Sequence, residues 1–207
     1  MRLASLLLGL FLWGVAIVAV LESRLGLSPW DVLHQGIARH TPLSFGAANI
    51  AVGAVVLVAA WLLGTRPGVG TLLNTLLVGT FIQALLAIGP VARLHEQALA
   101  SRIGLLALGI LVTGAGSAFY IGADLGAGPR DSLMLAGARS LRKRVGLVRA
   151  SLEAGALVAG VVLGGTVGVG TAVYALAVGP VVEGGFWTLR VSGLAVPEPA
   201  EALLLAE

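Results

Sequence analysis

The fold is decided by a stretch that occurs twice, Leu25-Gly26-Leu27-Ser28-Pro29-Trp30-Asp31 and, 100 residues later, Leu125-Gly126-Ala127-Gly128-Pro129-Arg130-Asp131. A second pair of stretches, Gly68-Val69-Gly70-Thr71 and Gly168-Val169-Gly170-Thr171, repeats at the same offset. Chance matches of Leu, Ala and Val are expected in an apolar chain, but chance does not reproduce both of these stretches at one spacing. A fixed offset indicates an internal repeat. The chain is therefore predicted to contain two copies of one unit.

The composition excludes a water-soluble domain. Of the 207 residues, 57% are hydrophobic and 11% are charged, whereas soluble domains are typically about 45–50% apolar and about 25% charged. So few charged side chains cannot cover a surface that faces water, and the expected surroundings are the lipid bilayer. The 30 glycines suit membrane helices that approach each other closely. The same small-residue faces also suit a homodimer.

Each unit contains three apolar segments of about the 20 residues that a helix needs to cross a bilayer. Their expected ranges are 3–21, 45–64 and 71–89 in the first unit, and 103–121, 147–164 and 171–189 in the second. The first segment has the pattern of a signal peptide, but its counterpart inside the chain identifies it as a membrane helix. We expect an all-α membrane protein of six transmembrane helices, with repeats at 1–92 and 98–190 and a short C-terminal tail at 191–207.

The two repeats are expected to be inverted relative to each other. Three spans is an odd number, so the second unit should enter the membrane from the opposite side. Lys and Arg concentrate in cytoplasmic loops, and the largest basic group here lies in one loop, at Arg139, Arg142, Lys143, Arg144 and Arg149. We therefore expect a multi-pass protein with both termini in the cytoplasm.

A short extra helix is predicted after the first span of each unit. Ser28 suits the N-cap position, Pro29 the first helical position, and Asp31 the first turn, where a negative charge is favourable. Pro129 and Asp131 repeat this pattern in the second unit. About twelve residues form a helix of roughly 18 Å, which reaches the midplane of a bilayer without crossing it. Each segment is therefore predicted to be a half-helix.

Two placements of the half-helices are open. As re-entrant helices, both would point their N-termini into the bundle, and Asp31, Asp131 and Arg130 would converge around one polar cavity. As amphipathic helices at the membrane surface, they would turn Trp30 towards lipid and leave Asp31 and His34 in water. The sequence pattern is compatible with both.

Polar residues in the third spans extend the candidate site. Glu183 in the second unit corresponds to Gln83 in the first, and ionisable side chains in membrane helices typically mark sites or pathways. The candidate solute-binding residues are Asp31, Asp131, Arg130, Trp30, Glu183 and Gln83. The Gly-Val-Gly-Thr stretches lack the Lys of a phosphate-binding loop, so Thr71 and Thr171 are predicted to cap the starts of helices.

Several classes of function are excluded. The chain has no Cys, which excludes thiolate metal sites and Cys nucleophiles, and its three His residues lack metal-ligand spacing. Neither a nucleophile elbow nor a soluble domain for a cofactor is present. The basic residues have no aromatic residues between them, so nucleic acid is not an expected partner. We expect no metal, no cofactor, no catalytic residues and no enzymatic activity.

The stretches from Leu25 to Gly36 and from Gly64 to Asn74 resemble the YczE/YyaS/YitT family of bacterial integral membrane proteins, and most closely its YczE branch. Ser28-Pro29-Trp30-Asp31 is the most specific part, and the resemblance extends from the first helix through Glu183. Such proteins often carry an acidic residue at the position of Gln83, and here only the second copy has the acid. The resemblance implies a bacterial plasma-membrane (inner-membrane) protein and implies no substrate.

A small-solute transporter or permease is the leading hypothesis, because secondary transporters commonly place their site at the interface of inverted repeats. Arg130 and the helix N-termini would suit an anionic or zwitterionic solute, and one repeat would rock against the other. One alternative is a non-transporting scaffold or accessory protein that stabilises a partner complex. Another is a channel, which the few polar residues on the spans disfavour.

Overall fold

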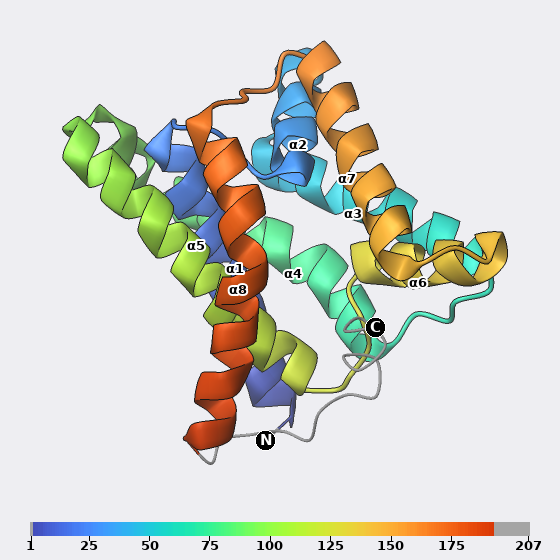
Figure 1. Ribbon diagram of the computed structural model, residues 1–207. Coiled ribbons are helices and arrows are strands. Elements are labelled where there is room, and N and C mark those ends of the chain that lie inside the picture. The colour runs from blue at the N-terminus through green and yellow to red at the C-terminus, as the bar shows by residue number, and fades with distance from the viewer. Residues whose placement is uncertain (1, 193–207) are drawn as a thin grey trace.

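The computed structural model of the chain describes residues 2–192, and within that range the protein is all-helical (Figure 1). The elements are α1 (Arg2–Ser23), α2 (Pro29–His40), α3 (Phe45–Leu62), α4 (Val69–Leu86), the 3-10 helix η1 (Val91–Glu96), α5 (Leu99–Gly122), α6 (Pro129–Leu141), α7 (Val145–Val162) and α8 (Val169–Val191). Six of them, α1, α3, α4, α5, α7 and α8, are long and apolar enough to cross a membrane. The predicted all-α fold with six candidate spans is confirmed. Most of the predicted tail at 191–207 lies outside the described residues.

The half-helices begin where the sequence predicts. Ser28 is the N-cap of α2, and its hydroxyl accepts a hydrogen bond from the backbone N–H of Asp31 at 3.3 Å. In the second unit Gly128 holds the N-cap position of α6 and offers no side chain for this bond. Proline follows the N-cap in both helices, where its missing N–H removes no helical hydrogen bond.

The third spans begin two residues earlier than predicted, at Val69 and Val169. Thr71 and Thr171 therefore lie inside the first turn and do not precede it. The Thr71 hydroxyl accepts a hydrogen bond from the Gly68 N–H at 3.1 Å, and the Thr171 hydroxyl accepts one from Gly168 at 3.3 Å. Both threonines cap their helix, as predicted, but from within its first turn, because the glycines hold the N-cap positions.

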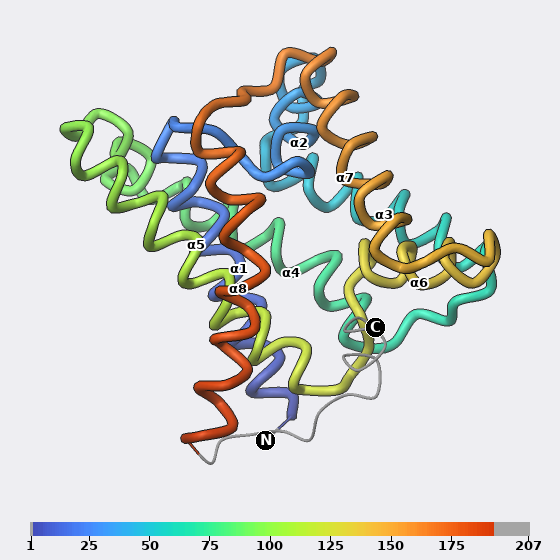
Figure 2. Tube along the Cα trace, in the orientation of Figure 1, coloured from blue at the N-terminus to red at the C-terminus, as the bar shows by residue number. Residues whose placement is uncertain are grey.

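The first spans of the two units, α1 and α5, pack closely and run antiparallel. A Cβ added to Gly9 would lie 2.5 Å from the backbone nitrogen of Tyr120, and one added to Gly109 would lie 2.6 Å from Val20. Residue 9 of α1 thus lies beside residue 120 of α5, and residue 20 beside residue 109, so the residue numbers rise along one helix as they fall along the other. The two helices therefore run in opposite directions. Figure 2 shows the same course, with α1 rising from the N-terminus and α5 descending beside it. The inversion of the whole units across a membrane stays a prediction.

The half-helices are exchanged between the units. α2 packs against α7 of the second unit, and α6 packs against α3 of the first. The Arg39 guanidinium donates to the carbonyl oxygen of Gly164 and to the Thr166 hydroxyl, the latter at 3.1 Å. In the second repeat, the corresponding Arg139 donates to the Thr65 hydroxyl of the first repeat at 2.9 Å. Each half-helix therefore ends on the turn between the second and third spans of the other repeat.

The linkers before the half-helices are exchanged in the same way. The Gly170 N–H donates to the Leu25 carbonyl, and the Gly70 N–H donates to the Leu125 carbonyl, both at 2.7 Å. Backbone comes this close because residues 70 and 170 carry no side chain. The repeats at 1–92 and 98–190 consequently interlock in one body of helices.

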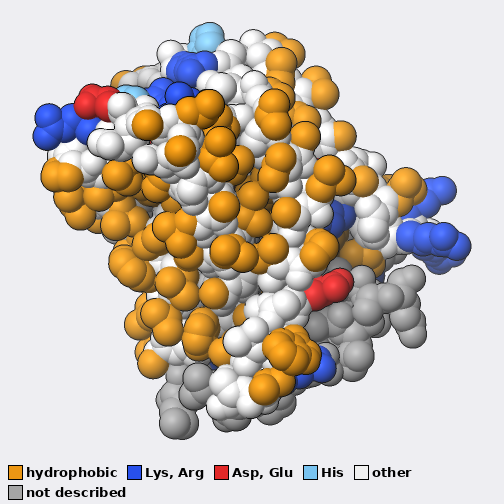
Figure 3. Space-filling model, turned by 60° about the vertical axis from the view of Figure 1, so that its left-hand side comes forward, with side chains coloured by type: hydrophobic (Ala, Val, Ile, Leu, Met, Phe, Trp, Pro, Cys, Tyr) orange, Lys and Arg blue, Asp and Glu red, His pale blue; other side chains and the backbone are white. Residues whose placement is uncertain are grey.

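The outer surface is apolar. Large hydrophobic side chains are exposed on several spans, among them Leu176 at 80%, Val162 at 79% and Val169 at 79%. Figure 3 shows one face whose middle is covered by hydrophobic side chains, while most charged side chains lie towards its edges. A continuous apolar surface of this kind is unfavourable in water and suits contact with lipid.

Candidate functional site

The first two turns of α2 carry a buried acid–imidazole pair. Ser28 Oγ donates to Asp31 Oδ2 at 2.5 Å, and His34 Nδ1 lies 3.2 Å from Asp31 Oδ1. Asp31 is 3% exposed and His34 1% exposed. The i, i+3 spacing places both side chains on one face of the helix. The surface placement required both in water, and the structure instead buries them inside the helix bundle.

Asn49 of α3 extends this network. Its Nδ2 lies 3.4 Å from the same His34 Nδ1 that contacts Asp31. One imidazole nitrogen carries either a proton or a lone pair, so it cannot donate to Asp31 and accept from Asn49 at once. The shorter contact involves the carboxylate and is the stronger one. We therefore assign the Nδ1 proton to the hydrogen bond with Asp31, with the Asn49 amide packed beside it.

Arg130 and Trp30 bring the starts of the two half-helices together. The Arg130 guanidinium carbon lies 5.0 Å from the centre of the Trp30 ring, in a cation–π arrangement. The positive charge of Arg130 also acts on Asp31 and His34. Of the residues predicted for the site, the structure thus brings Asp31, Trp30 and Arg130 into one cluster.

A small cavity adjoins this cluster. It has a volume of about 40 Å³ and lies between α1, α2, α3, α4 and the first turn of α6. Its polar lining consists of His34, Asn49, Asn74, Thr75, Arg130 and Asp131. A buried water needs about 10–15 Å³ of such volume, so the cavity has room for about three waters. The Asn74 amide nitrogen is buried and has no hydrogen-bond partner among the described residues, which leaves it able to donate to a bound group.

Gln83 and Glu183 do not join the site. Both are exposed, and neither lines the cavity. Position 83 follows Asn74 by nine residues, and nine residues at 100° each turn a helix by two and a half turns. Gln83 therefore points away from the cavity that Asn74 faces. Glu183 lies on α8, which packs against α5 and stands apart from α3 and α6.

The candidate residues from the sequence did not include His34, Asn49, Asn74 and Thr75. A usable signal exists for three of them. His34 follows Asp31 at helical spacing, and Asn49 and Asn74 are amides within otherwise apolar spans, where polar side chains are expensive. Thr75 gives no such signal, because its hydroxyl bonds the Thr71 carbonyl of its own helix at 2.8 Å. The choice of which polar residues meet depends on the exchange of half-helices, which no local pattern reports.

Residues 1–184 match a family of unknown function, DUF6198. The chain belongs to this family. It is 36% identical over 181 residues to an uncharacterized protein of Haemophilus influenzae, covering 87% of this chain and 81% of the relative. It is 37% identical over 130 residues to the uncharacterized membrane protein YczE of Bacillus subtilis, covering 61% and 58%. The uncharacterized protein YyaS of the same organism is 26% identical over 146 residues, covering 70% and 72%.

These relatives confirm the resemblance to the YczE and YyaS proteins. Together with the six apolar helices, the similarity to the membrane protein YczE identifies this DUF6198 member as a multi-pass membrane protein. No solved structure matches the chain.

Proposed function

We propose that this protein is a small-solute transporter of the bacterial inner membrane. The observation that carries the proposal is the pair of buried side chains Asp31 and His34, with the half-buried Arg130 beside them, next to a cavity in a protein whose outer surface is apolar. An ionisable residue at the centre of a membrane helix costs roughly 2.5–3.5 kcal/mol on insertion scales. A bundle that only had to be stable could use apolar side chains there. Charged groups retained inside membrane proteins typically belong to substrate or ion pathways.

The chemistry of the cluster suits a zwitterionic or anionic solute. Arg130 and the N-terminal turn of α6 favour an anionic group, and the free amide nitrogen of Asn74 is a further donor. Carboxylates of Asp31 and Asp131 favour a cationic group such as an ammonium. In the present state the cavity of about 40 Å³ accommodates only part of such a solute. Binding of the whole solute therefore requires the cavity to widen.

The orientation of the chain is part of the proposal. The loop between α6 and α7 carries Arg142, Lys143 and Arg144. Clusters of Lys and Arg in short loops favour the cytoplasmic side of a membrane. Both termini share that side if each unit crosses the membrane three times.

The test is ligand-dependent stabilisation of the purified protein. A panel of amino acids and small carboxylates is added at millimolar concentration, and the melting temperature is measured for each compound. A solute that binds only the folded protein at 100 times its Kd stabilises it by about 2.7 kcal/mol. We expect at least one compound to raise the Tm of the wild type and to lose this effect in Asp31→Asn.

Glu183→Gln is the matched control, since it also replaces a carboxylate by its amide but lies exposed and away from the cavity. It should keep the response to the compound. A Tm that no compound raises, or a response that Asp31→Asn retains in full, contradicts the proposal.

A further inference from the structure

The helices pack in two groups, and each group contains helices of both repeats. One group consists of α1, α4, α5 and α8, joined through the pairs α1–α5, α1–α4 and α5–α8. The other consists of α2, α3, α6 and α7, joined through α2–α7, α3–α6, α2–α3 and α6–α7. The expectation that one repeat rocks against the other does not fit this packing, because each repeat is divided between the groups. The largest contact between the two groups is that of α3 with α4, so a motion of one group relative to the other has to change this contact.

Contact between the two groups is one-sided. In the first repeat, α4 packs against α3. The corresponding pair in the second repeat, α8 with α7, reaches no comparable packing within residues 2–192. Figures 1 and 2 show α7 and α8 diverging from the turn that joins them. Within the most apolar 18 residues of each helix, 39% of the residues are buried in α4, but only 11% are buried in its counterpart α8.

Two pairs of glycines show the same difference at the level of single residues. Gly46 of α3 and Gly79 of α4 lie so close that a Cβ on either one would clash with the carbonyl oxygen of the other. Gly146 and Gly179 hold the matched positions on α7 and α8, and a Cβ on either would meet no atom of residues 2–192 within 4 Å. The second repeat therefore has the glycines that close packing needs, but the contact is not made in this state.

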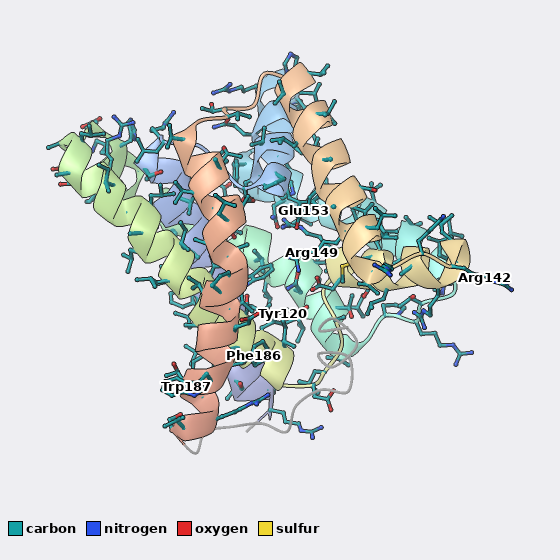
Figure 4. All side chains as sticks on the ribbon, in the orientation of Figure 1. Tyr120, Arg142, Arg149, Glu153, Phe186 and Trp187 are labelled. Carbon is teal, nitrogen blue, oxygen red and sulfur yellow. The ribbon has the colours of Figure 1, made fainter. Side chains whose placement is uncertain are left out.

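Helix α7 carries charged groups at the positions that line the cavity in the first repeat. Asn49 and Gly53 of α3 line that cavity, and their counterparts on α7 are Arg149 and Glu153. Arg149 Nε and Glu153 Oε1 form an ion pair at 3.1 Å, as their i, i+4 spacing predicts. Figure 4 shows both side chains pointing from α7 into the space between α7 and α8. The positions that line the cavity in the first repeat thus face the space between α7 and α8 in the second.

A solute that enters between α7 and α8 meets charged groups of α7. The Arg149–Glu153 ion pair holds the positions of Asn49 and Gly53, which line the cavity in the first repeat. Tyr174 on α8 occupies the position that Asn74 occupies on α4, and it packs against the buried side chains that include Val20 and Val32.

We infer that solute reaches Asp31 and Arg130 in this state by way of the space between α7 and α8, and that this space closes by contact of Gly146 with Gly179 while the Gly46–Gly79 contact opens. The inference rests on the proposed transport function. In the present state Gly46 contacts Gly79, and in the inferred second state Gly146 would contact Gly179. Because the internal repeat makes these contacts equivalent, the change replaces one close-packed glycine pair by another. Exchange between such states exposes a central site to the two sides of a membrane in turn.

The test is disulfide formation in the full chain, which has no native Cys, in membrane vesicles. A Cβ added to Gly53 lies 4.0 Å from the Thr75 Cβ, within the range of about 3.5–4.5 Å that a disulfide requires. Gly53→Cys with Thr75→Cys reports the closed contact of α3 and α4. The matched pair Glu153→Cys with Ala175→Cys reports closure of α7 on α8. Loss of reactivity towards a thiol-specific polyethylene glycol maleimide measures the bonded fraction.

We expect both pairs to form disulfides, since both contacts exist in turn. Glu153→Cys with Leu176→Cys is the control for random collision and should stay reduced. Leu176 is 80% exposed, and because it follows Ala175 in α8 it faces a different direction from Ala175. Gly146→Cys with Glu183→Cys provides a second closure pair that keeps the Arg149–Glu153 ion pair. If the first-repeat pair forms its disulfide while both second-repeat closure pairs stay reduced, the inference is overturned. Because cross-linking needs no solute, a failure of the binding test with positive cross-linking would count against transport alone.

Discussion

Alanine at Gly46 and alanine at Gly146 should have different effects on stability, although the two substitutions are chemically identical. Both residues are the second residue of their helix, α3 or α7. The methyl group at position 46 would clash with the Gly79 carbonyl oxygen and would lie 3.1 Å from the Gln83 Cβ. The methyl group at position 146 would meet no atom of the described part of the chain within 4 Å. The pair therefore isolates the packing contact from every other effect of the substitution.

The magnitude follows from the clash. Replacing Gly by Ala in a helix gains up to about 1 kcal/mol of helix propensity, and this gain is common to both variants. Overpacking a tight contact costs about 1–3 kcal/mol, and this cost applies to Gly46→Ala alone. The difference between the variants should therefore be about 1–3 kcal/mol. For a chain of this size, roughly 2–4 °C per kcal/mol gives a gap of about 2–12 °C in Tm.

The assay is thermal unfolding of the two purified variants in the same detergent, beside the wild type. Gly46→Ala should melt below the wild type, and Gly146→Ala at or slightly above it. Equal melting temperatures for the two variants would refute the reasoning, because they would mean that α3–α4 and α7–α8 are packed alike. A larger loss in Gly146→Ala would indicate that the protein mainly occupies the opposite state.

Two further predictions concern the capping threonines and the orientation in the membrane. Thr71→Val removes the hydrogen bonds with the Gly68 N–H and the Ala127 carbonyl, whereas Thr171→Val removes the described bond with Gly168. At about 1 kcal/mol per bond, thermal melts should show roughly twice the destabilisation in the first variant, and the reverse order would contradict the hydrogen-bond assignment. Lys143→Cys places a single exposed thiol in the basic loop, and an impermeant maleimide should label it in inside-out vesicles and not in intact cells. Labelling of intact cells would reverse the proposed orientation.

Much of the fold follows from local properties of the sequence. The length of each apolar segment predicts a span, and Ser28-Pro29 predicts the start of α2, because capping and the missing proline N–H act over one turn of helix. The starts of α4 and α8 were predicted two residues late, because the apolar pattern locates a span without showing which glycine holds its N-cap. The site was predicted in part. Asp31, Trp30 and Arg130 were recognised from the repeated motif, while His34 and Asn49 were recognisable only as polar residues without known neighbours.

The sequence by itself determined two copies of one unit, six apolar helices and two half-helices, since these depend on interactions within a few turns of chain. Only the tertiary structure decided that the half-helices pack on the opposite repeat, and that Gln83 and Glu183 lie outside the cavity. It alone also decided that Gly46 meets Gly79 while Gly146 and Gly179 stay apart. Local sequence cannot make that last distinction, because both glycine pairs occupy the same positions of the repeat. The two glycine pairs differ because α3 packs against α4 while α7 and α8 reach no comparable packing within the described residues, and that difference depends on the packing of all the helices.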